Sequence, residues 1–533
     1  MAETKNIVIV VVLIAVIVGA GYVVLTMPTT PADTSITVGT TFEIGRVPHP
    51  LTVHGGDDPI VANVFEGLVE YVSDTLEIEP VLAESMPLVS SNGLEYTFTL
   101  REDVTFHDGT AFNASCVDYY FDLIFTNGAG MTYIYTEGLV NHTEVVSEFV
   151  VKFVLNTPNS DFIGTLCHIA AYIPSPSAIE LYDVENVNDH PIGTGPLKFV
   201  SKIIDTEVVL EANNDWWRLN HGGVITVSSV VFVQIADAAT LKISIDSGEI
   251  DLTDGRFNLA DYESLLANTA LTTYDISSTA GRRWLTFNMN ETLWDVFSNK
   301  TMRQAFAYAI PYDEIIDIGL GGLGERQYSF LPPEYIGYKD VFNYDYNATK
   351  SLELIAEAGH TAPVEVTLHI TPTHYGASEP DIAALIQSYA LDAGFDVTIV
   401  QEEYAAYKAS YKTTGTQEMN LWSWTSNYPS TDDWASSFIG STGWGPRYSM
   451  GTAGDMASVF PHIDALVYEA AGTTNDTRKV EILEELQDLW AEWVPNIFIW
   501  REVRYQFSRA NIQGLEYGVS GMWDYNLHNL VKT

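Results

Sequence analysis

Basic residues are scarce in this chain. Among its 533 residues are 25 Lys and Arg against 70 Asp and Glu, which gives a formal net charge of −45 at pH 7. A protein that binds nucleic acid neutralises phosphates with clustered Lys and Arg, and this chain has too few bases for such a surface. We therefore exclude DNA and RNA as partners. The acidic excess is typical of a solvated surface, with adaptation to salt as a further interpretation.

Cysteine is also rare, since Cys116 and Cys167 are the only two. An oxidising compartment would permit one disulfide between them, and two buried thiols are the alternative. The Cys and His residues do not show the clustered spacing of a metal site. We expect neither a metal nor a cofactor.

The motifs of common enzyme classes are absent as well. The sequence contains no HExxH, no GxSxG and no Walker loop. The segment HPIGTGPLKF, residues 190–199, lacks the glycine spacing and the Lys-Ser/Thr of a phosphate-binding loop, so it predicts a tight turn before a strand. Adjacent acids such as Asp432 and Asp433 rarely face each other across a glycoside. We expect a protein that is not an enzyme, with a secreted hydrolase as a minor alternative.

One long apolar run is present, at residues 6–25, and it contains no charge. Twenty helical residues span roughly 30 Å, the thickness of the hydrocarbon core of a bilayer. We predict that residues 1–25 form a short cytoplasmic tip and an uncleaved transmembrane anchor, with a cleaved signal as the alternative. Residues 26–35, rich in Pro and Thr, predict an extended linker. The remainder is expected outside the cytoplasm, at the cell membrane.

The rest of the chain is long enough for more than one domain and alternates short strands with helices, which indicates an α/β architecture. The predicted strands include EYTFTL, SEFVVKFVL and TEVVLEA, and the predicted helices include residues 113–125, 299–318 with a break at Pro311, 347–360 and 477–495. The last of these helices has a predicted apolar face of six residues: Val480, Leu483, Leu486, Leu489, Trp490 and Trp493.

Aromatic residues gather in LWSWTSNYPSTDDW, residues 421–434, with one Asn and two Asp beside three Trp. Aromatic faces beside a few polar groups are typical of a site that holds an organic molecule. A surface loop whose Trp side chains fill a core is the alternative.

Many segments in register resemble the family 5 solute-binding proteins of ABC importers, the oligopeptide, dipeptide and nickel receptors. The most specific is LEYTFTLREDVTFHDGTAFNASCVDYYF, residues 94–121. The others are DDPIVANVFEGLVEY, IEPVLAESM, HPIGTGPLKF, ANNDWW, SGEIDLTD, WLTFNMN, MRQAFAYAI, FNYDYNATKSLELIAEAGH, IDALVYEA and VPNIFIW. The resemblance covers the chain from about Thr37 to its end.

The resemblance implies a two-lobed clamp of the class II, large peptide-binding type. Transferred to this sequence, lobe I takes residues 36–275 with an inserted subdomain at about 59–191. Lobe II takes residues 276–501, and residues 502–533 return to lobe I. Such a receptor closes on its ligand and delivers it to an ABC permease in the membrane. We expect it to act as a monomer.

The resemblance also implies where a ligand would bind. Peptide-binding members commonly carry an Asp three residues after the Trp that aligns with Trp424, where it pairs with the α-ammonium group of the peptide. This chain has Asn427 at that place, with Asp432 and Asp433 as compensating acids. For the ligand carboxylate it offers His374, or Arg282 and Arg283.

A peptide is the expected ligand, and an oligosaccharide is the alternative of the same fold. Sugar rings could stack on exposed indoles, and the chain offers six candidates for that role: Trp216, Trp217, Trp284, Trp422, Trp424 and Trp444.

Overall fold

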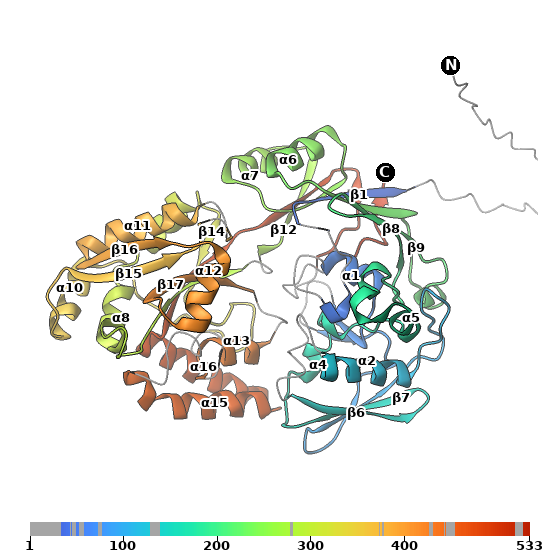
Figure 1. Ribbon diagram of the computed structural model, residues 1–533, viewed down its shortest axis with the longest axis horizontal. Helices are drawn as coiled ribbons and strands as arrows, with labels where there is room; N and C mark the ends of the chain where they lie inside the picture. The colour runs from blue at the N-terminus through green and yellow to red at the C-terminus, as the bar shows by residue number, and fades with distance from the viewer. Residues whose placement is uncertain are drawn as a thin grey trace, which may run out of the picture.

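The computed structural model shows two lobes connected by two crossing segments (Figure 1). It describes residues 34–42, 44, 49–52, 58–72, 77–127, 139–277, 281–372, 374–375, 378–425, 430–441, 443, 454–517 and 526–533. In this part of the chain no helix combines the length and the apolar character that a membrane span needs. The predicted span at residues 6–25 lies outside the described residues.

Lobe I is built on a seven-stranded mixed sheet. In spatial order its strands are β12 (Leu271–Asp275), β19 (Tyr505–Arg509), β11 (Leu252–Asp254), β1 (Ser35–Thr40), β10 (Ser229–Gln234), β9 (Glu207–Ala212) and β8 (Leu197–Ile203). Strand β1 is parallel to β10 and β11, while β19 is antiparallel to β11 and β12. The helices α6 (Ala238–Ser247) and α7 (Leu259–Leu266) enclose a small separate core.

A subdomain is inserted in lobe I between β1 and β8. Its four-stranded antiparallel sheet has the order β4 (Leu88–Val89), β5 (Glu95–Thr99), β7 (Val150–Leu155) and β6 (Val140–Ser147). The helices of this part of the chain are α1 (Asp58–Val64), α2 (Ala114–Asn127), α4 (Phe162–Thr165) and α5 (Pro176–Asn186), with the strand pair β2 (Val69–Tyr71) and β3 (Ile78–Pro80). Figure 1 shows this subdomain at the lower side of lobe I, with α4 towards α13 and α15 of lobe II.

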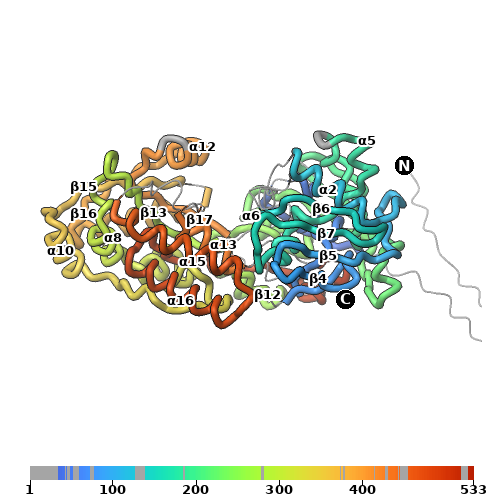
Figure 2. Tube along the Cα trace, turned by 90° about the horizontal axis from the view of Figure 1, so that it is seen from below, coloured from blue at the N-terminus to red at the C-terminus, as the bar shows by residue number. Residues whose placement is uncertain are grey.

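Lobe II is built on a six-stranded mixed sheet. Its order is β14 (Gly324–Arg326), β18 (Asn496–Glu502), β13 (Arg282–Phe287), β17 (Met419–Trp424), β15 (Val364–Ile370) and β16 (Phe395–Gln401). The helices are α8 (Lys300–Ala307), α9 (Tyr312–Glu314), α10 (Ala348–Glu357), α11 (Glu379–Asp392), α12 (Tyr404–Ala409), α13 (Thr431–Phe438), α15 (Phe460–Gly472) and α16 (Asp476–Trp493). In both views α12 and α16 lie on opposite sides of these strands (Figures 1 and 2).

Two segments cross between the lobes, one from β12 to β13 and one from β18 to β19. They are hydrogen-bonded to each other: the amide of Ile276 donates to the carbonyl of Arg504 at 2.9 Å, and the amide of Arg504 donates to Oγ of Ser277 at 3.0 Å. Each lobe has a large apolar core of its own, one of residues within 36–232, 252 and 512–530, and one within 284–500. Separate cores with a narrow bonded connection allow the lobes to move as units.

Local sequence chemistry explains where several helices begin and end. Oδ1 of Asn113 accepts from the amide of Ser115 at the start of α2, and Oδ1 of Asn347 accepts from the amide of Lys350 at the start of α10. The expected break at Pro311 separates α8 from α9. In the turn before β8, a Cβ on Gly193 would lie 2.1 Å from the carbonyl oxygen of Val64, so the turn can pack against the end of α1 only with glycine there.

The buried face of α16 differs from the predicted one. The structure buries six residues of this helix: Lys479, Ile482, Leu483, Leu486, Gln487 and Trp490. Three of the predicted face residues (Val480, Leu489 and Trp493) are only partly buried. The prediction ranked side chains by apolar character, whereas the packed surface of this helix includes a charge and an amide that find polar partners in the interior.

The possible disulfide between Cys116 and Cys167 is not formed. Each cysteine carries a buried thiol. Sγ of Cys116 donates to the carbonyl of Ala111 at 3.6 Å, and Sγ of Cys167 donates to the carbonyl of Ile163 at 3.8 Å. The structure therefore corresponds to the second of the two alternatives, in which both residues are buried thiols.

Candidate ligand site between the lobes

The predicted site residues that the structure describes all belong to lobe II, and two of them, Arg282 and Trp424, lie at the end of its sheet next to the crossing segments. Because β12 leads directly into lobe II, its carboxyl end lies on the lobe II side, and so do the carboxyl ends of β11 and β1, which run in the same direction as β12. On lobe II, the first residue of β13, Arg282, pairs with the last residue of β17, Trp424. Ligands of open α/β sheets bind beyond the carboxyl ends of the strands. A ligand between the lobes would therefore contact side chains at these strand ends.

The indoles of the predicted site lie at different depths. Trp284 and Trp422 are 0% and 1% exposed, and the Trp422 ring packs on the rings of Tyr407 and Tyr411, at 4.9 Å from each. Trp424 is half-buried at the sheet edge, with its ring centroid 4.9 Å from that of Trp434. Of these three predicted contacts, Trp424 has the face that a ligand could reach. Asn427 and Trp444 lie outside the described residues.

The two predicted arginines of β13 are buried and already paired. Arg283 is bonded to the carboxylate of Glu379, and its guanidinium lies 4.5 Å from the ring centroid of Tyr375. Arg282 is bonded to Oε1 of Gln327, and its guanidinium lies 5.2 Å from the ring of Trp434. Burial, and then the charge of Arg501, lower the pKa of Arg282 to about 10.

A cationic group lies on the α12 side of the lobe II sheet. The imidazole of His374 is stacked on the ring of Tyr404 with centroids 3.4 Å apart. Burial lowers the pKa of His374, and three nearby cations lower it further: Arg256, Arg283 and Lys408. Arg256 follows β11 of lobe I, so this group draws on both lobes. The side chains of Arg256 and Lys408 are exposed, and a group of like charges favours an anion beside it.

An acidic group lies on the other side of the sheet, at the start of α13. Asp432 and Asp433 occupy the first turn of this helix, and the hydroxyl of Ser430 accepts from both of their amides. Nζ of Lys479 lies 3.3 Å from Oδ2 of Asp432 and 2.8 Å from Oδ1 of Asp161, which belongs to the inserted subdomain. Burial, and then the charge of Asp161, raise the pKa of Asp432 to about 7. Oδ1 of Asp432 is buried and has no hydrogen-bond partner among the described atoms.

Sequence reasoning missed Arg256, Asp161 and Lys479. Neither Arg256 nor Asp161 stands in a motif, and both approach lobe II only through the tertiary fold. Lys479 did leave a signal, because it precedes Leu483, Leu486 and Trp490 by 4, 7 and 11 residues and so falls on their helical stripe. A charge on an apolar stripe indicates a buried ionic partner.

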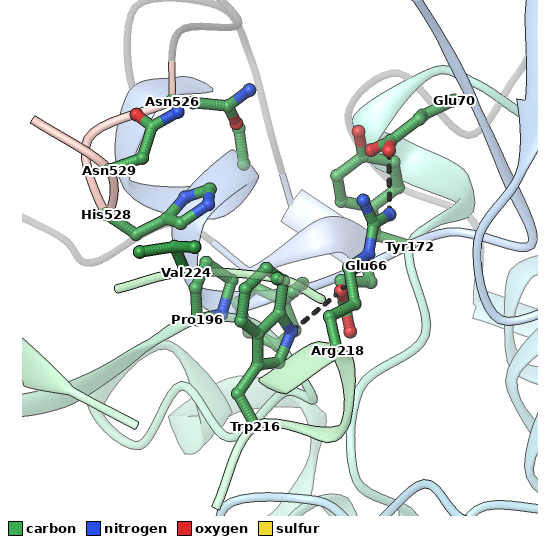
Figure 3. Close-up of a pocket in the computed structure, with 13 residues that line it drawn as sticks. Glu66, Glu70, Tyr172, Pro196, Trp216, Arg218, Val224, Asn526, His528 and Asn529 are labelled. Atoms are coloured by element: carbon green, nitrogen blue, oxygen red, sulfur yellow. Dashed lines mark hydrogen bonds and ion pairs between the residues drawn. The ribbon is translucent and has the colours of Figure 1, made fainter. Parts of the chain in front are cut away.

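A cavity of about 350 Å³ lies within lobe I (Figure 3), and no residue of these two groups lines it. Glu70 accepts from Nη2 of Arg218 at 2.7 Å, and Glu66 accepts from the indole of Trp216 at 3.1 Å. The C-terminal residues Asn526, His528 and Asn529 line the opposite wall. Glu66 and Glu70 already accept hydrogen bonds from residues of lobe I. We therefore interpret this cavity as a polar gap where η5 (Trp217–His221), the end of α1 and the C-terminal segment meet, and not as the ligand site.

Comparison with known proteins identifies the relatives of this fold. The profile of the bacterial extracellular solute-binding proteins, family 5 Middle, matches residues 77–446. The glutathione-binding protein GsiB of Pectobacterium atrosepticum is 27% identical over 480 residues, 88% of each chain. The dipeptide-binding protein of Escherichia coli is 24% identical and covers 93% of this chain and 91% of its own. The periplasmic binding protein DppA of Helicobacter pylori, solved in complex with the peptide STSA, superposes with a TM-score of 0.73 at 23% identity, over 93% of this chain and 98% of that one.

Proposed function

Because the chain belongs to the bacterial extracellular solute-binding proteins of family 5, we propose that it captures a short peptide between its lobes and delivers it to an ABC permease. In this proposal lobe I consists of residues 36–275 and 502–533, with the subdomain 59–191 inserted, and lobe II consists of residues 276–501. The two bonded crossing segments support this division. Ligand binding closes the lobes, and the permease distinguishes the closed form from the open one.

The observation that carries the peptide assignment is the opposite charge at the two ends of the lobe II edge. The cationic group around His374 and Arg256 suits a carboxylate, and the acidic group around Asp432 suits an ammonium. A short peptide with free ends has both charges in one molecule. The relatives named for binding glutathione and dipeptides support the same ligand class.

Within this site we assign contact with the ligand to Trp424 and Asn427, and to Arg256 and His374 at the carboxylate end. Trp284, Trp422, Arg282 and Arg283 support the site from behind, because all four are at most 2% exposed and packed against protein. Asp432, whose Oδ1 is buried without a partner, and Asp433 beside it supply negative charge near the ligand ammonium.

The oligosaccharide alternative receives less support. Trp284 and Trp422 are at most 1% exposed, and Trp216 and Trp217 are each 4% exposed. Sugar stacking needs an open aromatic face. The structure describes five of the six candidate Trp residues, and of these five only Trp424 is more than 4% exposed.

We further propose that residues 6–25 anchor the receptor as a single membrane span, with the monomeric binding domain on the extracytoplasmic side. The apolar run supports this, and anchoring would raise the local concentration of the receptor at its permease. N-terminal sequencing of protein from the membrane fraction tests it. A start near Ala32 or Asp33 would refute the anchor.

Calorimetry with trialanine, N-acetyl-trialanine, trialanine amide and maltotriose tests the ligand class. We expect trialanine to bind most tightly and each blocked end to weaken binding by about tenfold or more. Solution scattering of the trialanine complex should show a smaller radius of gyration than the free protein. Binding of maltotriose alone, or binding of trialanine with an unchanged scattering profile, would contradict the proposal.

A further inference from the structure

Lys479 is a buried cation that is shared between the lobes. Its side chain is 7% exposed, although it belongs to the first turns of α16, a helix with a largely solvated charged face. Nζ donates to Oδ1 of Asp161 at 2.8 Å and to Oγ of Ser160 at 3.1 Å, both in lobe I. It also donates to Oδ2 of Asp432 in lobe II at 3.3 Å.

Other bonds hold the same segment of lobe I against lobe II. The hydroxyl of Ser430, which caps α13, donates to Oδ2 of Asp161. The amide of Ser160 donates to the carbonyl of Ala471 in α15 at 2.8 Å. On its own side the segment is ordered by Asn159, whose carbonyl accepts from the hydroxyl of Tyr96 at 2.9 Å and whose Oδ1 accepts from the amide of Asp161 at 2.8 Å. Three helices of lobe II, α13, α15 and α16, therefore form hydrogen bonds with one short segment of the inserted subdomain, residues 160–161.

The stability of this contact between the lobes depends on the charge of Lys479. Asp161 and Asp432 come from different lobes, and the ammonium of Lys479 bonds to both. Without this ammonium, the same closure would bring two carboxylates together in a buried place, which is unfavourable. When the lobes separate, Lys479 keeps Asp432 as its partner within lobe II, so opening leaves no buried cation unpaired.

We infer that Lys479, Asp161 and Asp432 form an interlobe clasp that favours the closed arrangement of the lobes, whichever ligand lies between them. The inference rests on the clamp mechanism of the proposed function, but it concerns the protein without ligand. A receptor that holds part of its population closed releases its ligand more slowly, and the permease would have to break the clasp to empty it.

Solution scattering of the ligand-free protein tests the clasp with three single variants. Lys479→Met removes the shared cation, and Asp161→Asn removes the lobe I anion without touching the core of lobe II. Arg478→Met is the matched control, because the adjacent Arg478 makes its ion pairs with Glu469 and Glu481, both in lobe II. We expect the ratio of open to closed molecules to rise by roughly tenfold or more in the first two variants, seen as a larger radius of gyration.

Arg478→Met should leave the scattering profile unchanged. Thermal unfolding shows whether Lys479→Met has lost its lobe II packing. If it has, the scattering profile of Asp161→Asn alone tests the clasp. Identical profiles for the wild type and Asp161→Asn would overturn the clasp, as would an equal expansion in Arg478→Met. Neither result depends on whether trialanine binds, so the clasp and the proposed function can fail separately.

Discussion

Arg283 and Glu379 form an ion pair in which each side chain is 2% exposed. Removing one partner of such a pair leaves the other charge buried without compensation, which typically costs about 3–5 kcal/mol. We expect Arg283→Met and Glu379→Met each to lower the free energy of unfolding by about this amount, as measured by urea denaturation. The double variant should lose less than the sum of the two, because neither charge is then left alone.

The matched control for this pair is the surface pair Lys300–Glu492, whose side chains are 27% and 57% exposed. Glu492→Gln should change the stability by about 1 kcal/mol or less, since water screens exposed pairs. If Arg283→Met lowers the free energy of unfolding no more than Glu492→Gln does, the buried pair does not stabilise lobe II. Arg283 would then be a candidate ligand contact again.

The sequence predicted the parts of the fold that depend on near neighbours. The capped start of α2 and of α10 and the break at Pro311 follow from side chains within a few residues of the backbone groups that they bond or block. The role of Asn427 in place of an anionic anchor stays a prediction, because this residue lies outside the described residues.

The sequence could not predict contacts made across the fold. The buried state of Lys479 depends on Asp161, 318 residues earlier in the chain, and the cationic group needs Arg256 of lobe I beside His374 of lobe II. The burial of Trp422 likewise depends on Tyr407 and Tyr411, which precede it in other elements of lobe II. These pairings are made in the tertiary fold, so a pattern within one element can at most indicate that a residue is buried, as for Lys479, and cannot name its partner.

Arg256 provides a test of the carboxylate end. We expect Arg256→Gln to weaken the binding of trialanine by about 1–3 kcal/mol, because an exposed cation that faces the carboxylate is lost. Trialanine amide lacks this carboxylate, so the variant and the wild type should bind it equally in calorimetry. Lys242→Gln is the control: Lys242 pairs with Asp246 on α6 of lobe I and should leave both affinities unchanged. Equal losses for both peptides would place Arg256 outside the carboxylate site.

Glu418 should make the stability of the protein depend on pH. Glu418 is 4% exposed, and its carboxylate accepts from the amide of Thr367 at 2.7 Å. Burial raises its pKa from 4.5 to about 7. Between these two values the folded protein binds the proton more tightly than the unfolded chain, so this group stabilises the fold less as the pH rises through that range.

The variant Glu418→Gln should remove this dependence. Urea denaturation at pH 4 and at pH 8 should show the variant gaining up to about 3 kcal/mol relative to the wild type at the higher pH. Glu365→Gln, at an exposed position of β15, is the control and should follow the wild type at both values. A variant whose stability falls between pH 4 and pH 8 as steeply as that of the wild type would refute the role of Glu418.

The ammonium end of the ligand site is tested at Trp424 and Asn427. Trp424 is the half-buried indole of the lobe II edge, next to Trp434 and Phe438. Truncating it to Ala should weaken trialanine binding by about 1 kcal/mol or more, because the ligand loses an aromatic face. Trp493→Ala, which removes another half-buried indole at the end of α16, should leave binding unchanged. Binding of the wild-type strength by Trp424→Ala would mean that this indole serves packing alone.

Asn427→Asp then separates ligands by their amino terminus. A carboxylate at this position should strengthen the binding of trialanine by about 1–3 kcal/mol, because a charged acceptor replaces an amide opposite the ligand ammonium. N-acetyl-trialanine has no ammonium, so the new carboxylate would be desolvated without a partner and binding should stay equal or weaken. Calorimetry on the two peptides measures this difference directly. A gain for both peptides, or for neither, would show that position 427 does not face the amino terminus of the ligand.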